Sequence, residues 1–482
     1  MPAVAKLTGK IIDAATGERL EARVQVVGPN GTNLGPPDAM WKVGSGEPFF
    51  YSDGQFSLDI PRGLVRVVVE RGTEFVPWRH DVEAPKSGTI ALDVSLERWS
   101  DLPERGWHPG NTHIHYDEKE KDPDRRLRYD SRVEGLRMTA VSILKRWELL
   151  YATNKYPPGV MNEFTDTHHY VQCGEETRHN AGSPFGIGYG HVMLLNIRNA
   201  VDPLSRGLLV DAFDPDYPPL SYACDDARRQ GGIVIWCHNG QGMEAPVAAA
   251  LGKVDAMNLF DPYWVDTEYD LWYAMLNCGI RLPASTGSDW FVCSANRVYA
   301  HGEPEFDYET WLKALRDGRT FITNGPALYV KVNGVESGAT VSAEPGGEVD
   351  VEVEWTSHYA VDRVEVVMNG RVVAARALAQ EPSGSARFAV PVRSDGWVAA
   401  RLAGSARDSF NQAIWAHASP VYLTTGRSAG PERRESARFF VERINGALGW
   451  TSTGAKFYTD AQRKEVQDLF RAGREYYRKL SR

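Results

Sequence analysis

The period of the hydrophobic pattern changes along this chain, and this change constrains the fold more than any other feature. Up to about residue 98, short apolar runs alternate with polar residues between turn signals, as in Gln55–Ile60. Alternation with a period of two indicates β-strands, so this region predicts a small β-sandwich. From about residue 107 to 325, apolar runs alternate with helical segments, which predicts a layered or barrel-shaped α/β domain.

A second β-rich region and a helical tail follow the α/β part. Gly347–Trp355 alternates strictly, and Val364–Val373 carries Asn-Gly between apolar runs, which is typical of a tight hairpin. These patterns predict an Ig-like β-sandwich. Apolar residues then recur at helical spacing in Glu432–Asn445 and Thr459–Leu480. The predicted domains are 1–98, 105–325, 326–425 and 430–482.

Within the α/β part, the predicted strands matter because active sites of such domains lie at the carboxyl ends of the strands. The predicted strands are Arg137–Leu144, Val192–Ile197, Gly232–Cys237, Val254–Leu259 and Ile280–Ser285. The predicted helices are Pro219–Gln230, Thr267–Asn277 and Tyr308–Asp317.

A His-x-His pair lies at the start of the α/β part, in Trp107–His115. Side chains two residues apart on a strand point the same way, so His113 and His115 would present two imidazoles together. Two neutral imidazoles form half of a zinc or transition-metal site. Taken alone, such a pair is more often a chance or surface feature than a metal site.

Further candidate ligands follow apolar runs downstream. His238 comes directly after Gly232–Cys237, and Asp289 follows an apolar run that ends in Gly-Ser. Glu176 and His191 flank a loop and would converge if that loop folds back. His238 could instead be a hydrogen-bonded core histidine, and Asp289 a cap for the next segment. The donor mixture fits zinc, manganese or iron better than magnesium.

The composition of the chain limits the classes of binding partner and the cellular compartment that we expect. The net charge of −9 argues against nucleic acid and anionic membranes, and no apolar run approaches the ~20 residues of a membrane span. The first residues lack the apolar core of a signal peptide, and the five Cys show no Cys-x-x-Cys spacing. We therefore expect a cytoplasmic protein with reduced thiols, or a periplasmic or secreted one if a leader has been removed.

Several motifs occur in the order of the PHP (polymerase and histidinol phosphatase) superfamily, which this chain resembles over about 107–340. They are Gly110–His115, Gly-x-Glu at 174–176, Gly190-His191, the Gly-Gly strand that ends in His238, and Gly287-Ser288-Asp289. The runs Leu276–Leu282 and Leu315–Pro326 resemble the carbaryl-hydrolase-like (CehA/McbA) branch. The first 98 residues resemble a carboxypeptidase-regulatory-like module, which is an accessory domain.

The resemblance implies a distorted (βα)7 barrel between two β-sandwiches, with a C-terminal helical tail. It also implies a cluster of divalent metals and hydrolysis of ester, carbamate, amide or phosphoester bonds. Glu176 would bridge metals, with Glu175 as the alternative. The implied ligands are His113, His115, Glu176, His191, His238 and Asp289.

The chain departs from the family pattern at two places. The usual Thr-Asp-His is replaced by Ile143–Trp147, and the final Asp-x-His reads Asp289-Trp290-Phe291. Two histidine ligands are missing, so we expect one or two ions, zinc first and manganese or iron as alternatives. Lys145 stands where a ligand is usual; it would contact an anionic substrate, form a carboxylated bridge, or simply be solvated. Arg297 would hold the site loop or a substrate carboxylate.

We therefore predict a hydrolase that uses a metal-activated water to cleave an ester, carbamate or amide bond of a small organic substrate. His168, His169 and His179 would line the entrance, and Lys145, Glu176 and Arg297 are the candidate catalytic residues. A PHP-type phosphoesterase and a non-catalytic metal- or ligand-binding protein are the alternatives. The sequence does not determine the oligomeric state, and an oligomer is possible.

Overall fold

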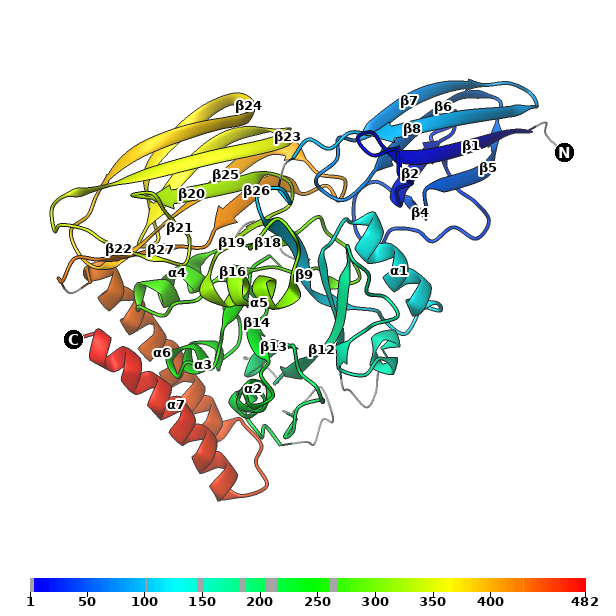
Figure 1. The fold of residues 1–482 in the computed structure, drawn as a ribbon. Helices are drawn as coiled ribbons and strands as arrows, with labels where there is room; N and C mark the ends of the chain where they lie inside the picture. The colour runs from blue at the N-terminus through cyan, green and yellow to red at the C-terminus, as the bar shows by residue number, and fades with distance from the viewer. Residues whose placement is uncertain are drawn as a thin grey trace.

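The molecule has two β-rich regions, a mixed α/β region and a pair of long C-terminal helices. The computed structural model describes residues 4–100, 102–144, 151–181, 187–204, 215–260, 268–427 and 429–482. In Figure 1 the two β-rich regions lie above the central α/β region, and the last two helices run along its lower left side. Each β-rich region has its own hydrophobic core.

The N-terminal region packs two sheets against each other. Strand β1 (Val4–Asp13) pairs with β5 and β8, and β2 pairs with β3, β4 and β6. Strand β5 alternates as the sequence predicted, with Phe56, Leu58 and Ile60 buried in the core. The other bounds are β2 (Ala22–Val27), β3 (Asn33–Leu34), β4 (Phe50–Ser52), β5 (Gln55–Pro61), β6 (Gly63–Glu70), β7 (Trp78–Ala84) and β8 (Thr89–Leu96).

The central sheet is organised around β9 (Trp107–His115), which is buried along its whole length. Strand β9 pairs in parallel with β10, and the pairing continues through β12, β13, β14, β15 and β16. Strands β12, β13 and β14 pair antiparallel, and the other pairs are parallel. The bounds are β10 (Met138–Ile143), β11 (Gly159–Val160), β12 (Tyr170–His179), β13 (Gly190–Leu195), β14 (Ile233–Trp236), β15 (Ala256–Asn258) and β16 (Ala284–Ser285).

After β16 the chain returns to the free edge of β9. The Thr112 amide donates to the Thr286 carbonyl, and the Ser288 amide donates to the His113 carbonyl. Strand β17 (Asp289–Trp290) then pairs with the carboxyl end of β9, and β18 (Arg297–His301) pairs with its amino-terminal half. The carboxyl end of β9 therefore lies between β10 and β17. The (βα)7 barrel that the resemblance implies stays a prediction.

One predicted strand is much shorter in the structure. The strand expected over Ile280–Ser285 is confined to β16, because Pro283 has no amide hydrogen and the Ile280 amide donates to Met275 at the end of α4. Helix α5 begins where predicted, with the Asp307 carboxylate accepting from the Thr310 amide. The helices are α1 (Pro123–Val133), α2 (Leu220–Arg229), α3 (Ala245–Ala250), α4 (Asp270–Asn277) and α5 (Tyr308–Asp317), with short 3₁₀ turns η1 (Ala152–Lys155) and η2 (His238–Gly240).

The C-terminal β region shares a sheet with the central region. Strand β19 (Thr320–Thr323) pairs with β18 on one side and with β26 (Ala413–Ala418) on the other. The predicted Asn-Gly hairpin is confirmed, since Asn369 and Gly370 both have positive φ between β23 and β24. The remaining strands are β20 (Ala327–Val332), β21 (Val335–Glu336), β22 (Thr340–Ser342), β23 (Glu348–Met368), β24 (Arg371–Pro391), β25 (Gly396–Arg407) and β27 (Val421–Thr424).

Helices α6 (Pro431–Thr453) and α7 (Asp460–Leu480) dock on the central region. Helix α6 continues past the expected end at Asn445. Glycines at 446 and 449 weaken its intrinsic propensity, but burial of Ala447 and Trp450 stabilises the last turns. The Tyr477 hydroxyl, on α7, donates to the Pro246 carbonyl on α3 at 2.8 Å. Among the residues described, no helix is both long enough and apolar enough to cross a membrane.

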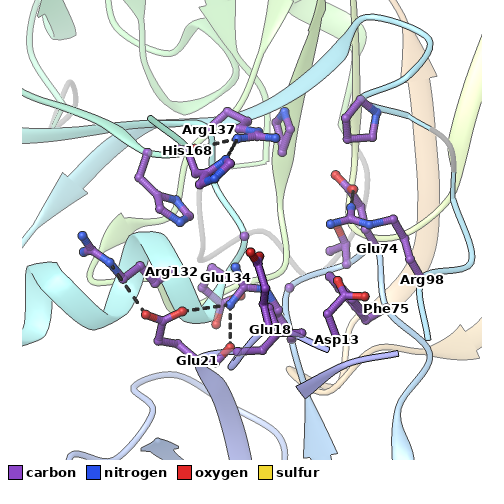
Figure 2. A pocket seen from close by; sticks show the side chains of 18 of the residues that line it. Asp13, Glu18, Glu21, Glu74, Phe75, Arg98, Arg132, Glu134, Arg137 and His168 are labelled. Atoms are coloured by element: carbon purple, nitrogen blue, oxygen red, sulfur yellow. Dashed lines mark hydrogen bonds and ion pairs between the residues drawn. The ribbon is translucent and has the colours of Figure 1, made fainter. Parts of the chain in front are cut away.

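A charged cavity of about 300 Å³ separates the N-terminal sandwich from the central region (Figure 2). Glu21 projects from the sandwich and pairs with Arg132 on α1, at 3.9 Å. On the central side, Arg137 donates to His168 Nδ1 at 2.9 Å. Pro109, near the amino end of β9, also lines this cavity, so His168 lies far from the carboxyl end of that strand.

Candidate metal centre

The six ligands implied by the sequence converge at the carboxyl end of β9. They form two groups that share Glu176, and within each group the ligand atoms lie within 4.8 Å of one another. All six side chains are buried. The groups are His113, His115, Glu176 and Asp289, and Glu176, His191 and His238. A buried cluster of imidazoles and carboxylates could hold a metal ion.

The two β9 histidines lie side by side because the strand alternates. His113 and His115 point to one face, with their Nε2 atoms 3.1 Å apart, while Ile114 packs into an apolar cluster behind them. The alternation of side chains along a single strand therefore brings two donor nitrogens together without help from any loop.

Glu176 reaches the same point from β12. Its Oε2 lies 2.5 Å from His115 Nε2, and its Oε1 lies 3.4 Å from His191 Nδ1. Glu176 therefore joins the two groups, as a bridging ligand must. Glu175 points to the other side of β12, where its Oε2 accepts from the Val201 amide at 2.7 Å. The geometry favours Glu176 over Glu175 as the ligand.

His238 and Asp289 enter the cluster from residues with unusual backbones. Their φ angles are 54° and 57°, in the left-handed region that non-glycine residues seldom occupy. Such conformations cost about 1–3 kcal/mol each and gather at functional sites. Gly287 lets the Asp289 segment approach β9, because a Cβ there would lie 2.4 Å from His113 Cβ.

Hydrogen bonds outside the cluster fix which nitrogen of two imidazoles faces inward. His115 Nδ1 donates to the Ser142 carbonyl at 3.1 Å, so Nε2 carries the lone pair that faces Glu176. His191 Nε2 donates to Asn180 Oδ1 at 2.7 Å, so its Nδ1 faces the cluster. A lone pair that faces a carboxylate oxygen at 2.5 Å requires a cation or proton between them. The donor set thus fits a divalent cation.

The ionisation states also suit metal binding. Burial lowers the pKa of His115 and lowers that of His191 still further, which keeps both imidazoles neutral. Burial alone would raise the pKa of Glu176, but Arg178 and the two β9 histidines hold it well below its usual value. Neutral imidazoles and an ionised carboxylate are the forms that bind metals.

Sequence reasoning missed Arg178. Its Nη2 lies 2.5 Å from Glu176 Oε2 and 3.3 Å from Asp289 Oδ1, and only 9% of its side chain is exposed. Arg178 stands two residues after Glu176 on β12. The alternation that pairs His113 with His115 therefore also predicts that Arg178 shares the face of Glu176.

Aromatic rings cover one side of the cluster. Trp290, which directly follows Asp289, lies 5.6 Å from the His115 ring and 5.2 Å from the Tyr151 ring, between centroids. The Arg178 guanidinium lies 5.6 Å from the Trp290 ring centroid. Trp290 and Tyr151 thus form an aromatic wall beside the candidate ligands.

The structure places the other candidates elsewhere. Lys145 lies outside the described residues. Arg297 is fully buried away from the cluster; it donates to Glu134 at 2.6 Å and to the carbonyls of Ser294 and Asn296. These contacts hold the loop before β18, and none of them is to a candidate metal ligand. His179 pairs with Asp216, and His169 bonds to the Leu136 carbonyl.

Comparisons with known proteins add little to this geometry. No protein-family model matches the chain, and no curated protein matches it. Among solved structures, the apo structure of Bacteroides uniformis β-glucuronidase 3 aligns at 12% identity over 88% of this chain and 64% of that chain, with a TM-score of 0.16. A score this low informs neither fold nor function. The class is therefore defined by the site alone: a protein with a buried histidine–carboxylate cluster that could hold a metal.

Proposed function

We propose that this protein is a metal-dependent hydrolase of the PHP type that cleaves an ester, carbamate or amide bond in a small organic substrate. The observation that carries the proposal is the convergence of four histidines and two carboxylates around Glu176. These ligands come from separate strands and loops, and two adopt costly backbone conformations. Such an arrangement is hard to explain by packing alone.

Each residue has a role in this proposal. A bound divalent cation would polarise the scissile carbonyl and lower the pKa of water towards neutrality. Glu176 would be shared by two sites, which supports up to two ions, zinc before manganese or iron. Asp289 would offset charge, and Trp290 with Tyr151 would hold the apolar part of the substrate.

One observation favours phosphoesterase activity as a second candidate. Arg178 supplies a buried guanidinium beside the proposed ligands, and guanidinium groups bind phosphoryl oxygens well. The same group also fits a carboxylate, so Arg178 does not by itself favour phosphate over an anionic ester.

The test is elemental analysis of the purified protein beside an activity panel. The panel contains 4-nitrophenyl acetate, 1-naphthyl N-methylcarbamate, 4-nitroacetanilide and bis(4-nitrophenyl) phosphate. We expect one or two equivalents of metal, turnover of an ester, carbamate or amide, loss of turnover on chelation and recovery when zinc or manganese is restored. Folded, metal-loaded protein that turns over no substrate would instead indicate a binding protein.

A further inference from the structure

The charge of the metal centre points to the kind of substrate it takes. Glu176 and Asp289 together neutralise one divalent cation, while the histidines of the cluster bring no charge when neutral. While the metal-bound water is neutral, Arg178 leaves the site with a net positive charge, and a second cation would increase it. A buried excess of positive charge is costly unless an anion completes the site.

One N–H donor of Arg178 has no partner in the described part of the chain. Among the residues that the structure describes, its Nε is buried and has no hydrogen-bond partner. Its Nη2 forms ion pairs with two candidate metal ligands, Glu176 and Asp289. A guanidinium carries five N–H groups in a planar fork that matches a carboxylate or phosphoryl group. The unpartnered Nε–H of this fork is therefore a donor for an oxyanion beside the metal cluster.

The surroundings of Arg178 indicate what the substrate carries beside its anionic group. Its guanidinium lies against Trp290, and Trp290 lies against both Tyr151 and His115. An anion bound to Arg178 would thus have aromatic surface beside it and the metal cluster within reach. This arrangement suits a substrate that carries an aromatic or other apolar group next to its anionic group.

We propose that Arg178 binds a carboxylate of the substrate, so that the enzyme prefers esters or amides that carry a negative charge near the scissile bond. This inference rests on the proposed hydrolase function, and it names the substrate class for the same site. The competing role of Arg178 is structural: a clamp that only fixes Glu176 and Asp289.

A matched substrate pair separates the two roles. We would compare mono-4-nitrophenyl glutarate with its neutral methyl ester, using the zinc-loaded protein, Arg178→Met and Arg178→Lys. The parent should prefer the anionic ester at least about 10-fold in kcat/KM, chiefly through KM, since a charged bidentate contact is lost in the neutral ester. Arg178→Met should abolish this preference, and Arg178→Lys should restore part of it.

The control is Arg198→Met, because Arg198 is an exposed arginine outside the cluster. It should keep the parent preference. A structural clamp would lower both activities and the metal content of Arg178→Met in the same proportion, leaving the preference unchanged. That result would overturn the inference.

A binding measurement keeps the inference testable if neither ester is cleaved. Calorimetric titration of zinc-loaded protein with 3-phenylpropanoate should show binding that 3-phenylpropanamide lacks and that Arg178→Met abolishes. Such binding without turnover would refute the proposed hydrolase and retain the anion site. Equal binding of acid and amide would overturn the anion site, and stronger Arg178-dependent binding of phenylphosphonate would overturn the assignment to a carboxylate.

Discussion

At the scale of single residues, the cluster depends on hydrogen bonds that hold each imidazole in one tautomer. Asn180 accepts from His191 Nε2 and so leaves Nδ1 free to face Glu176. Replacing Asn180 by Leu should weaken metal affinity by about 10–100-fold, since ligand orientation would be lost. Asn180→Asp keeps an acceptor and should retain most of the affinity. Competition with a zinc indicator measures both variants; equal affinities in the two would contradict this role.

Asp289 provides the sharpest test of the ligand set. Asparagine tolerates the left-handed backbone and has nearly the same volume, so Asp289→Asn removes mainly the charge. We expect substoichiometric metal and turnover lower by about 100-fold or more. Asp307→Asn, an exchange at the exposed cap of α5, should leave both unchanged. If Asp289→Asn keeps full metal and turnover, Asp289 is only a turn residue.

How much of the site the sequence predicts depends on whether a local rule applies. Strand alternation alone places His113 beside His115, and it would have placed Arg178 beside Glu176. No such rule connects Arg297 to Glu134, which lies 163 positions earlier at the end of α1. The direction of a buried arginine depends on that distant partner, so sequence alone left its role open.

At the scale of elements, α7 supports the strand that carries His191. Phe470 is fully buried and its ring centroid lies 5.9 Å from that of Tyr189, just before β13. Phe470→Ala should destabilise the protein by about 3–5 kcal/mol through cavity formation. Phe439→Ala, on the exposed side of α6, is the matched control and should cost much less. Thermal unfolding of both variants measures the difference, and equal losses would mean that α7 is an appendage.

Element boundaries followed the sequence where capping residues are present and failed where tertiary contacts decide. Helix α5 begins at Tyr308 as predicted, and in the structure Asp307 caps it. The end of α6 depends instead on burial of Trp450 against the central region, which outweighs the glycines near it. Propensity is a weak guide wherever packing supplies the larger free energy.

At the scale of the whole molecule, a buried histidine couples the C-terminal β region to α4. His417 Nδ1 donates to a carbonyl and its Nε2 lies 2.6 Å from the Tyr273 hydroxyl. Burial lowers the pKa of His417 to about 3, whereas the unfolded chain should titrate near 6.5. The unfolded state therefore binds the proton first as pH falls, and the stability present above pH 6.5 is lost progressively towards pH 3.

When the pH is lowered from 8 to 5, titration of His417 should reduce the free energy of unfolding of the parent protein by about 2 kcal/mol. His417→Gln lacks the titrating group, so its free energy of unfolding should fall less over the same range. His80→Gln, at an exposed position on β7, should follow the parent. Urea denaturation at several pH values measures the three slopes, and parallel curves for the parent and His417→Gln would exclude this coupling.

Metal removal should affect only part of the molecule. All six candidate ligands lie in the central region, and the two β-rich regions have separate apolar cores. Hydrogen exchange after chelation should therefore show faster exchange in β9, β12 and β13, and unchanged protection in β1, β5 and β6. Loss of protection throughout the N-terminal sandwich would show that its folding depends on the metal.

The position of β19 has a consequence for how this architecture can be rearranged by gene fusion. No described strand pairing joins the N-terminal sheets to the central sheet; that sandwich attaches through the Arg23–Glu134 ion pair and through isolated backbone hydrogen bonds such as that from the Gly72 amide to the Val133 carbonyl. Its removal would therefore cut no strand ladder. Strand β19, in contrast, hydrogen-bonds to both β18 and β26. Recombination at the apparent boundary near residue 325 would leave strands with unpaired backbone N–H and C=O groups on both fragments. Such exposed edge strands favour aggregation.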